Sequence, residues 1–283
     1  MVAWVAVSAI RILVVGAGGV GGFFGAKLAR AGVPVTLLAR GAHLEAIQRH
    51  GLRVRSAVEG ESVTKVEAVG DVRGLPSSDV VLFCVKSFDT ETAAAAIRPV
   101  IGPDTAVVSL QNGVDNEETI DRVLGAGHAV GGVAYVFAAI ESPGVIAHRF
   151  AGHVVVGELD GRPSPRLARL QAAFTAAGVR TEVVPDVRRA LWQKYLMISA
   201  QAGMTSLTRA PIGVIRAVPE SWRMYRRIVE ELAAIGRAAG VPLADDIVET
   251  IVTAAEGLAP EAYSSLHHDL TQGRRLELEA LHG

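Results

Sequence analysis

Cysteine and net charge are what this chain of 283 residues most clearly lacks. Its single cysteine, Cys84, cannot form a disulfide within the chain, and it excludes a zinc site built from cysteines. Lysine and arginine number 28 against 29 acidic residues, so no excess positive charge is present to bind a phosphate backbone, and we expect no nucleic-acid partner. With 50% hydrophobic and 20% charged residues, the composition is too apolar for a disordered chain.

Long hydrophobic runs are missing as well. The longest near the start, Val2 to Ile10, is interrupted by Ser8 and is too short for a membrane-spanning helix, which needs about 20 residues. No basic residue precedes it, as a secretory signal would require. We therefore expect no membrane partner and a cytoplasmic location. The adjacent His267 and His268 have no other metal ligands at a recognisable spacing, and we predict no metal site.

Lysine is scarce in this chain: only four residues are lysine, and arginine supplies the other basic side chains. Arginine serves most surface roles, so a lysine in a pocket is a candidate for titratable chemistry that arginine cannot perform. This reasoning favours Lys86 and Lys194 as candidate functional residues.

A glycine-rich segment follows the first predicted strand. Arg11–Val15 is a short, apolar and β-branched run that is typical of a buried parallel strand. It leads into Gly16-Ala17-Gly18-Gly19-Val20-Gly21, then into a stretch with helical spacing that reaches Arg30, and then into a second strand at Val33–Ala39. This order of strand, glycine turn, helix and strand is the one that a dinucleotide-binding unit requires.

The glycines of this turn have separate roles in such a unit. Gly16 permits the tight turn, Gly18 lets the backbone approach a pyrophosphate, and Gly21 lets the helix pack closely on the strand. The start of the helix adds free N–H groups and a partial positive charge. We predict that Gly16, Gly18, Gly19 and Gly21 bind the cofactor; the alternative is a glycine-rich turn without a ligand.

The end of the second strand indicates which dinucleotide binds. An NAD-binding unit usually has an acidic residue there, which bonds the ribose hydroxyls. No acid occurs from Val35 to Arg40, and Arg40 suits a 2′-phosphate by charge and by its two-pronged geometry. We therefore predict NADP rather than NAD, the alternative being a solvated surface arginine.

Polar side chains follow two further predicted strands. Asp79–Val85 leads into Lys86, and Thr105–Leu110 leads into Gln111 and Asn112. In an open parallel sheet, ligands bind beyond the carboxyl ends of the strands, so both Lys86 and Asn112 are candidates for the cofactor site. Both are otherwise ordinary loop residues, because Asn-Gly is a common turn pair.

The character of the chain changes after Asp186. Strand-like runs between Ala129 and Gly157 extend the sheet, and a helix and a short strand follow before Pro185-Asp186. Beyond this point β-branched runs largely disappear, and the two longest helices are expected at Arg188–Thr208 and Pro219–Ala239. We predict an α/β fold with an N-terminal Rossmann-type doubly wound parallel sheet, residues 1–185, and an all-helical C-terminal domain, residues 186–283.

Taken together, these segments resemble the ketopantoate reductases (2-dehydropantoate 2-reductases). The resemblance spans almost the whole chain in family order. It is carried by Gly16–Gly21, Arg40, Val85-Lys86, Gln111-Asn112-Gly113, Pro143-Gly144, Trp192-Gln193-Lys194 and the spaced residues Ser265, Asp269, Gly273 and Glu277. It implies an enzyme that reduces ketopantoate to pantoate with NADPH, on the path to pantothenate and coenzyme A.

The resemblance also implies roles for individual residues. Lys194 matches the catalytic lysine and general acid, and Glu277 matches a catalytic glutamate that binds the substrate hydroxyl. Ser265 matches a serine near the substrate carboxylate, and Asn112 and Lys86 match residues where cofactor and substrate meet. The chemistry is consistent, because hydride transfer to a ketone builds negative charge on oxygen that a cation stabilises.

One departure from the family concerns the helix that carries Lys194. Family members commonly have asparagine four and eight positions after the lysine, where this chain has Ile198 and Ala202. On a helix of ~100° per residue, Gln201 and Thr205 fall within about 20° of Lys194 and are predicted to bind substrate instead. The substituted positions leave another 2-oxo acid open as the substrate. The resemblance further implies a helix beyond His282.

Two other interpretations remain open. A related opine or 3-hydroxyacid dehydrogenase shares the domain order, but the segment from Ser265 to Glu277 argues against it. A non-catalytic NADP-binding sensor would keep the glycines and Arg40 and could discard Lys194. The joint presence of Lys194, Glu277 and Asn112 argues against a sensor. The apolar helical domain also permits a homodimer.

Overall fold

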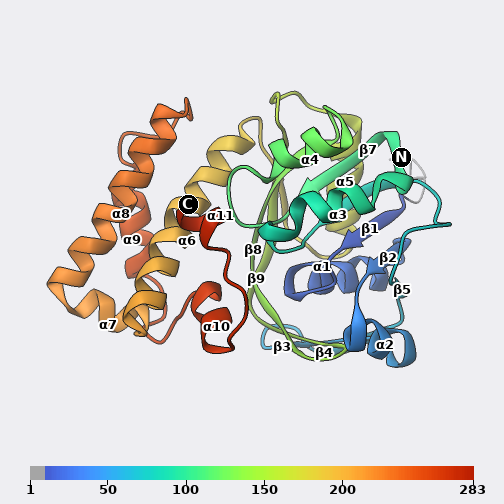
Figure 1. Ribbon diagram of the computed structural model, residues 1–283, viewed down its shortest axis with the longest axis horizontal. Coiled ribbons are helices and arrows are strands. Elements are labelled where there is room, and N and C mark those ends of the chain that lie inside the picture. Colours follow the sequence, from blue (N-terminus) through green and yellow to red (C-terminus); the bar gives the residue numbers. More distant parts are fainter. Residues whose placement is uncertain (1–9) are drawn as a thin grey trace, which may run out of the picture. The chain divides into compact units, whose positions relative to one another are not determined.

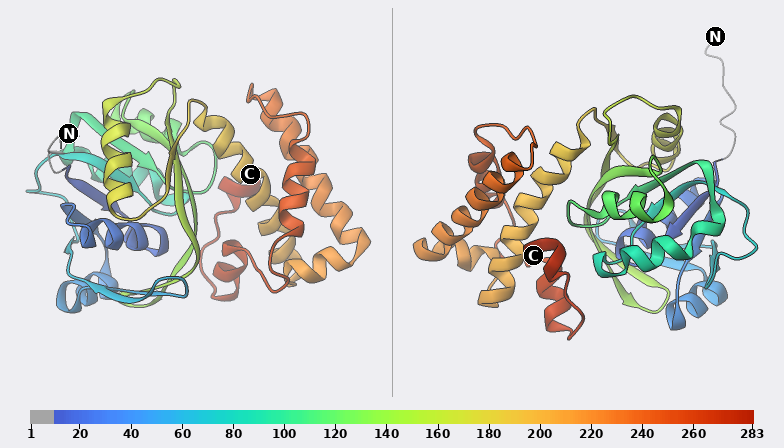
Figure 2. Two further views of the ribbon diagram at one scale, coloured as in Figure 1. Left: turned by 180° about the vertical axis from the view of Figure 1, so that it is seen from behind. Right: turned by 45° about the horizontal axis from the view of Figure 1, so that its top comes forward.

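The structure, a computed structural model, describes residues 10–283 and contains a ten-stranded sheet and a group of helices (Figures 1 and 2). It forms two compact units: one comprises the described residues up to Gln111 together with Asn116–Val187, and the other comprises Asn112–Asp115 and Arg188–Gly283. The apolar run from Val2 lies outside the described residues, except for Ile10, which is buried.

The sheet of the first unit is parallel in most of its pairings. Its order is β4-β3-β9-β8-β7-β6-β1-β2-β5, with β10 beside β9, and only the pairs β3–β4 and β8–β9 are antiparallel. The predicted α/β fold with a Rossmann-type sheet is confirmed, and the long β8–β9 hairpin makes the sheet mixed. The strands are β1 (Ile12–Val15), β2 (Val35–Leu38), β3 (Leu52–Ser56), β4 (Gly60–Thr64), β5 (Glu67–Val69), β6 (Ser78–Phe83), β7 (Ile101–Ser109), β8 (Ala129–Ser142), β9 (Val145–Glu158) and β10 (Thr181–Val183).

Helices cover both faces of the sheet. Alternate side chains of the central strands point to opposite faces, and both sets are apolar, so both faces are buried. Ile12 and Val14 of β1 pack in the cluster that includes α1 (Gly19–Arg30) and α5 (Pro165–Ala176). Leu13 and Val15 pack in another cluster, which includes α3 (Thr90–Ala96) and α4 (Asn116–Leu124). Burial on both faces explains why these strands are continuous apolar runs.

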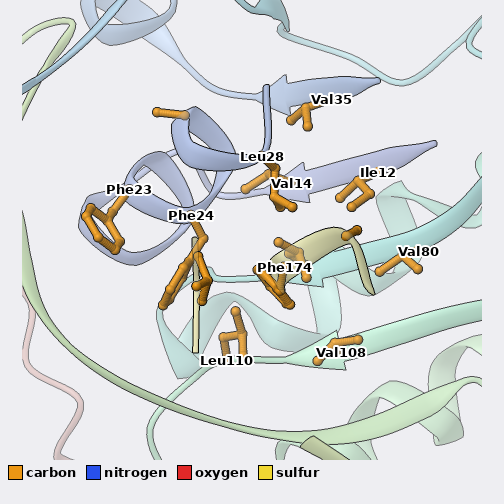
Figure 3. Close-up of a cluster of buried hydrophobic side chains, with 14 of the residues drawn as sticks. Ile12, Val14, Phe23, Phe24, Leu28, Val35, Val80, Val108, Leu110 and Phe174 are labelled. Atoms are coloured by element: carbon orange, nitrogen blue, oxygen red, sulfur yellow. The ribbon is translucent and has the colours of Figure 1, made fainter. Parts of the chain in front are cut away.

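Aromatic side chains of the first cluster join α1 to α5 on one face of the sheet (Figure 3). Phe24 and Phe174 are fully buried and meet edge to face, with ring centroids 5.8 Å apart. Phe23 and Phe24 are likewise edge to face, at 5.2 Å. The Phe24–Phe174 pair joins α1 to α5, and α1 begins directly after the glycine turn.

Several elements between β2 and β6 give no clear sequence signal. The helix α2 (Gly41–His50) buries only Ile47 fully, so its apolar periodicity is weak. The strand β4 lies at the edge of the sheet and is mostly exposed. These elements were not predicted because tertiary pairing, rather than a local pattern, stabilises them.

The second unit is entirely helical where its residues form regular structure. Its central helix, α6, has buried residues all round and contributes Leu196 and Ala200 to a core shared with Tyr225. No helix within residues 10–283 is long and apolar enough to cross a membrane. The helices are α6 (Val187–Thr208), α7 (Ile212–Ala217), α8 (Pro219–Ala238), α9 (Ile247–Glu256), α10 (Ser265–Thr271) and α11 (Leu278–His282).

Candidate active site

The glycine turn of the first unit has the geometry of a pyrophosphate cradle. Gly16 has a φ of 94°, a conformation that favours glycine, and it follows β1 directly. A Cβ on Gly21 would lie 2.2 Å from the Gly16 carbonyl oxygen, so α1 packs tightly on the turn. A Cβ on Gly18 would have no atom within 4 Å. The space over Gly18 therefore fits a ligand group that approaches the backbone.

The start of α1 suits an anion. Gly18 is its N-cap and supplies no side-chain cap, and the first turn has no acidic residue. Free N–H groups and the positive end of the helix dipole therefore remain available to a phosphate. Gly19 is constrained differently, because a Cβ there would lie 1.9 Å from the carbonyl oxygen of Ala138 in β8.

Arg40 lies at the same edge of the sheet as the glycine turn. It follows β2, a parallel neighbour of β1, and its side chain is 85% exposed. Its guanidinium pairs with Asp89 at 3.3 Å. Asp89 closes a 3-10 turn, Ser87–Asp89, after β6, the other neighbour of β1. No motif in the sequence singles out Asp89, although it follows a strand end just as Lys86 does.

Lys86 is exposed at the carboxyl end of β6, in a backbone segment that buried polar groups hold in place. The Gln111 amide donates to the Val85 carbonyl at 3.1 Å and to the Thr90 hydroxyl at 2.8 Å. The Thr90 hydroxyl donates to the Ser87 carbonyl at 2.8 Å. The carbonyls on both sides of Lys86 are thus fixed. Thr90 gives no signal of this role in the sequence.

In the second unit, Lys194 and Asn112 come together. The Lys194 Nζ donates to the Asn112 Oδ1 at 3.0 Å, and Asn112 precedes Gly113, whose φ is 106°. Glu277, just before α11, is 5% exposed. Burial lowers the pKa of the Lys194 ammonium to about 8, against the opposing effect of the Glu277 negative charge.

This combination can act as a general acid. A lysine with its ordinary pKa holds its proton too firmly near neutral pH, whereas a pKa of about 8 lies close to working pH. The ammonium also carries the positive charge that a forming alkoxide needs. Asn112 keeps Nζ in one direction through its hydrogen bond.

The three other predicted substrate-binding residues differ in their surroundings. Thr205 is fully buried; its hydroxyl donates to the Gln201 carbonyl at 2.7 Å and lies 2.8 Å from the Ser264 hydroxyl. Ser264 in turn caps α10 by accepting from the His267 N–H. Gln201 is half-buried, and Ser265, the first residue of α10, is exposed.

Comparison with known proteins assigns the chain to a family. The family model "Ketopantoate reductase PanE/ApbA" matches residues 12–161, and the model of its C-terminal domain matches residues 186–283. The chain belongs to the ketopantoate reductase family. Members of this family are oxidoreductases that act on a CH–OH group and bind a nicotinamide cofactor.

Individual relatives cover nearly the whole chain. The 2-dehydropantoate 2-reductase of Halobacterium salinarum is 33% identical over 97% of this chain and 90% of its own. A crystal structure of a PanE/ApbA family ketopantoate reductase from Ralstonia eutropha JMP134 is 37% identical with a TM-score of 0.88, over 96% of this chain and 89% of that one. The 2-dehydropantoate 2-reductase of Geobacter metallireducens has a TM-score of 0.90 and 32% identity, over 96% and 90%.

At the two positions where the family commonly has asparagine, the side chains are apolar and lie in or against the hydrophobic core of the helical unit. Ala202 is 2% exposed in the core of the helical unit, and Ile198 packs against that core. Neither position can supply an amide to a substrate. Among residues 10–283, no group of three or more histidine, cysteine, aspartate or glutamate side chains is placed to hold a metal ion.

The space over Gly18 leads to a testable prediction. We expect Gly18→Ala to fold normally, because the φ of −72° suits alanine and the new methyl group meets no atom. We expect its affinity for the nicotinamide cofactor to fall by at least about tenfold, or ~1.4 kcal/mol, because the methyl group occupies the ligand's space. Thermal unfolding and fluorescence titration with NADPH measure the two effects. Gly257→Ala, at an exposed helix end, is the control; equal cofactor affinity in Gly18→Ala would contradict the assignment.

Proposed function

We propose that this protein is an NADPH-dependent 2-oxo-acid reductase that reduces ketopantoate (2-dehydropantoate) to pantoate, a step toward pantothenate and coenzyme A. The observation that carries the proposal is Lys194, a partly buried lysine held by Asn112 whose pKa is about 8. The names of relatives that cover nearly the whole chain support ketopantoate as the substrate.

In this proposal Lys194 acts on the ketone oxygen of the substrate. A nicotinamide cofactor held by Gly16, Gly18 and Arg40 would supply the hydride that reduces the ketone carbon. The Lys194 ammonium polarises the C=O bond, stabilises the negative charge that develops on oxygen, and gives that oxygen a proton from Nζ. Atoms balance, because the ketone gains one hydride and one proton and lysine ends as the neutral amine.

Glu277 and Asn112 support this lysine. The Glu277 charge raises the pKa of the ammonium against burial, which keeps the proton on Nζ near neutral pH. The Asn112 carbonyl oxygen accepts one of the three ammonium hydrogens and leaves two for the substrate. We further propose that Glu277 accepts a hydrogen bond from a substrate hydroxyl, and that the exposed Ser265 binds the substrate carboxylate.

Arg40 supports NADP over NAD. Its guanidinium is 85% exposed at the end of β2, and its pairing with Asp89 is the kind of surface ion pair that contributes little stability. A dianionic 2′-phosphate can therefore compete with the carboxylate for it. The cytoplasmic location and the homodimer stay predictions.

The direct test follows NADPH oxidation with ketopantoate beside a panel of other 2-oxo acids. We expect turnover with ketopantoate, and we expect Lys194→Ala to lose about 10²–10⁴-fold in kcat while it still binds NADPH. Lys65→Ala, at an exposed lysine, serves as the control. Turnover with another acid alone would keep the chemistry and change the substrate. NADPH binding without turnover, unaffected by Lys194→Ala, would favour the sensor.

The pKa of Lys194 predicts how kcat for ketone reduction depends on pH. The general acid must be protonated, so we expect kcat for ketone reduction to be level below the lysine pKa and to fall as pH rises through about 8. Glu277→Gln removes the charge that raises this pKa. The kcat of this variant should therefore begin to fall at a lower pH than the kcat of the wild type. The exposed Glu279→Gln should keep the wild-type profile. A Glu277→Gln profile that moved to higher pH would contradict this role of the glutamate.

Arg40→Asp tests the cofactor preference. Replacing the guanidinium by a carboxylate repels the 2′-phosphate and offers an acceptor to ribose hydroxyls. We expect the ratio of kcat/KM for NADPH to that for NADH to fall by at least about tenfold, which corresponds to ~1.4 kcal/mol. Arg49→Asp, on the exposed side of α2, is the matched control. An unchanged ratio in Arg40→Asp would show that Arg40 does not bind the 2′-phosphate.

A further inference from the structure

His43, the third residue of α2, connects two loops of the first unit. Its Nε2 lies 2.8 Å from the carbonyl oxygen of Ala17, in the middle of the glycine turn. Its Nδ1 lies 3.0 Å from the backbone nitrogen of Gly144, in the turn between β8 and β9. The ring is half-buried between these two backbone groups.

The two partners determine the protonation state of His43. The Gly144 N–H can only donate, so Nδ1 must accept and carries no proton. The Ala17 carbonyl can only accept, so Nε2 must carry the proton and donate it. Burial lowers the pKa of His43, more than the hydrogen bond to Ala17 raises it, which favours the same neutral ring. A protonated ring would turn a second N–H toward the N–H of Gly144.

The bond to Ala17 acts on the peptide that leads into Gly18. In a planar trans peptide, the carbonyl of one residue and the N–H of the next point in opposite directions. Fixing the Ala17 carbonyl therefore fixes the direction of the Gly18 N–H. The peptide on the other side is held as well, because the N–H groups of Gly16 and Ala17 both face the Leu38 carbonyl, at 3.2 and 3.3 Å.

The opposite side of the His43 ring is equally constrained. Gly144 has a φ of 76°, and a Cβ on it would lie 2.9 Å from the Cβ of Ala46, so this turn packs directly on α2. The Gly144 carbonyl also accepts from the N–H of Arg53 in β3 at 2.9 Å. The turn that carries this N–H is thus held on α2 and β3, and the N–H donates to Nδ1, which sets the rotation of the ring.

We propose that His43 is a positioning residue for cofactor binding, which aims the Gly18 N–H at the pyrophosphate by holding the Ala17 carbonyl. The inference rests on the proposed function only in that the glycine turn binds a nicotinamide dinucleotide. His43 itself touches neither the 2′-phosphate nor the reacting atoms in this proposal. Its effect must therefore be equal for NADPH and NADH, which share the pyrophosphate.

The test measures dissociation constants of both cofactors by fluorescence titration, without substrate, for three variants. Glutamine places an amide N–H near the position of Nε2, asparagine places an amide near Nδ1, and phenylalanine keeps the ring without either nitrogen. We expect His43→Phe and His43→Asn to weaken both cofactors by about tenfold, the effect of one lost hydrogen bond, and His43→Gln to stay within about threefold of wild type. His50→Phe, at the exposed end of α2, is the control.

Steady-state kinetics separates positioning from catalysis. We expect KM for NADPH to rise in His43→Phe and His43→Asn, with kcat at saturating NADPH unchanged. Long-range nitrogen–proton NMR on the wild type should show the His43 ring with its proton on Nε2. If His43→Phe does not fold, the comparison of His43→Gln with His43→Asn decides the question.

Three results would overturn the inference: wild-type affinities in His43→Asn, a loss confined to NADPH, or a proton on Nδ1. A loss confined to NADPH would place the effect at the 2′-phosphate instead. The proposed function fails differently, because a wild-type protein that binds neither cofactor would refute that function before any His43 variant is compared.

Discussion

The tight packing of α1 between strands β1 and β2 and the β8–β9 hairpin of the same sheet is the constraint on which the first unit depends. Gly21 and Gly25 face β1 and β2, where a Cβ would lie 2.8 Å from Val14 and 2.7 Å from Leu37 side chains. Gly19 and Gly22 face the β8–β9 hairpin, where a Cβ would approach Ala138 and Ile146 as closely as 1.9 and 2.9 Å. Because protein interiors are close-packed, any side chain at these positions would push α1 away. The same packing sets the start of α1 just beyond β1, so glycines of one segment pack in the core and also form the turn that we propose binds the cofactor.

Two opposing effects set the pKa of Lys194 in the second unit. Desolvation favours the neutral amine, and the negative charge of Glu277 favours the ammonium. Their balance leaves the pKa near 8, within reach of proton transfer at working pH. An arginine at this position would remain charged in any such environment and could not donate its proton. A lysine at this position is therefore compatible with the proposed general acid, whereas an arginine is not.

Buried polar side chains fix the backbone of the loops at the carboxyl ends of the strands. Gln111 and Thr90 hold the carbonyls on either side of Lys86, and His43 holds the carbonyl before Gly18. Loops are the most mobile parts of a fold, yet cofactor sites need backbone groups in defined directions. Here side chains distant in sequence supply that rigidity. The backbone of the proposed site is therefore held by the side chains of Gln111, Thr90 and His43.

The sequence by itself determined the class of the fold, the glycine turn and the family. These depend on local patterns: continuous apolar, β-branched runs in β1, β6 and β7, helical spacing after Gly21, and glycines at fixed offsets. It did not reveal α2 or the edge strand β4, because few of their side chains are buried.

Only the tertiary structure decided which polar groups meet. Lys194 and Asn112 are 82 residues apart in sequence, Gly144 and His43 are 101 apart, and Arg40 pairs with Asp89 across 49. It also placed the Thr205 hydroxyl against Ser264, although the helical spacing of Thr205 from Lys194 predicted a role toward substrate. The physical reason is that hydrogen bonds and desolvation depend on neighbours in space, whereas a sequence pattern records only neighbours along the chain.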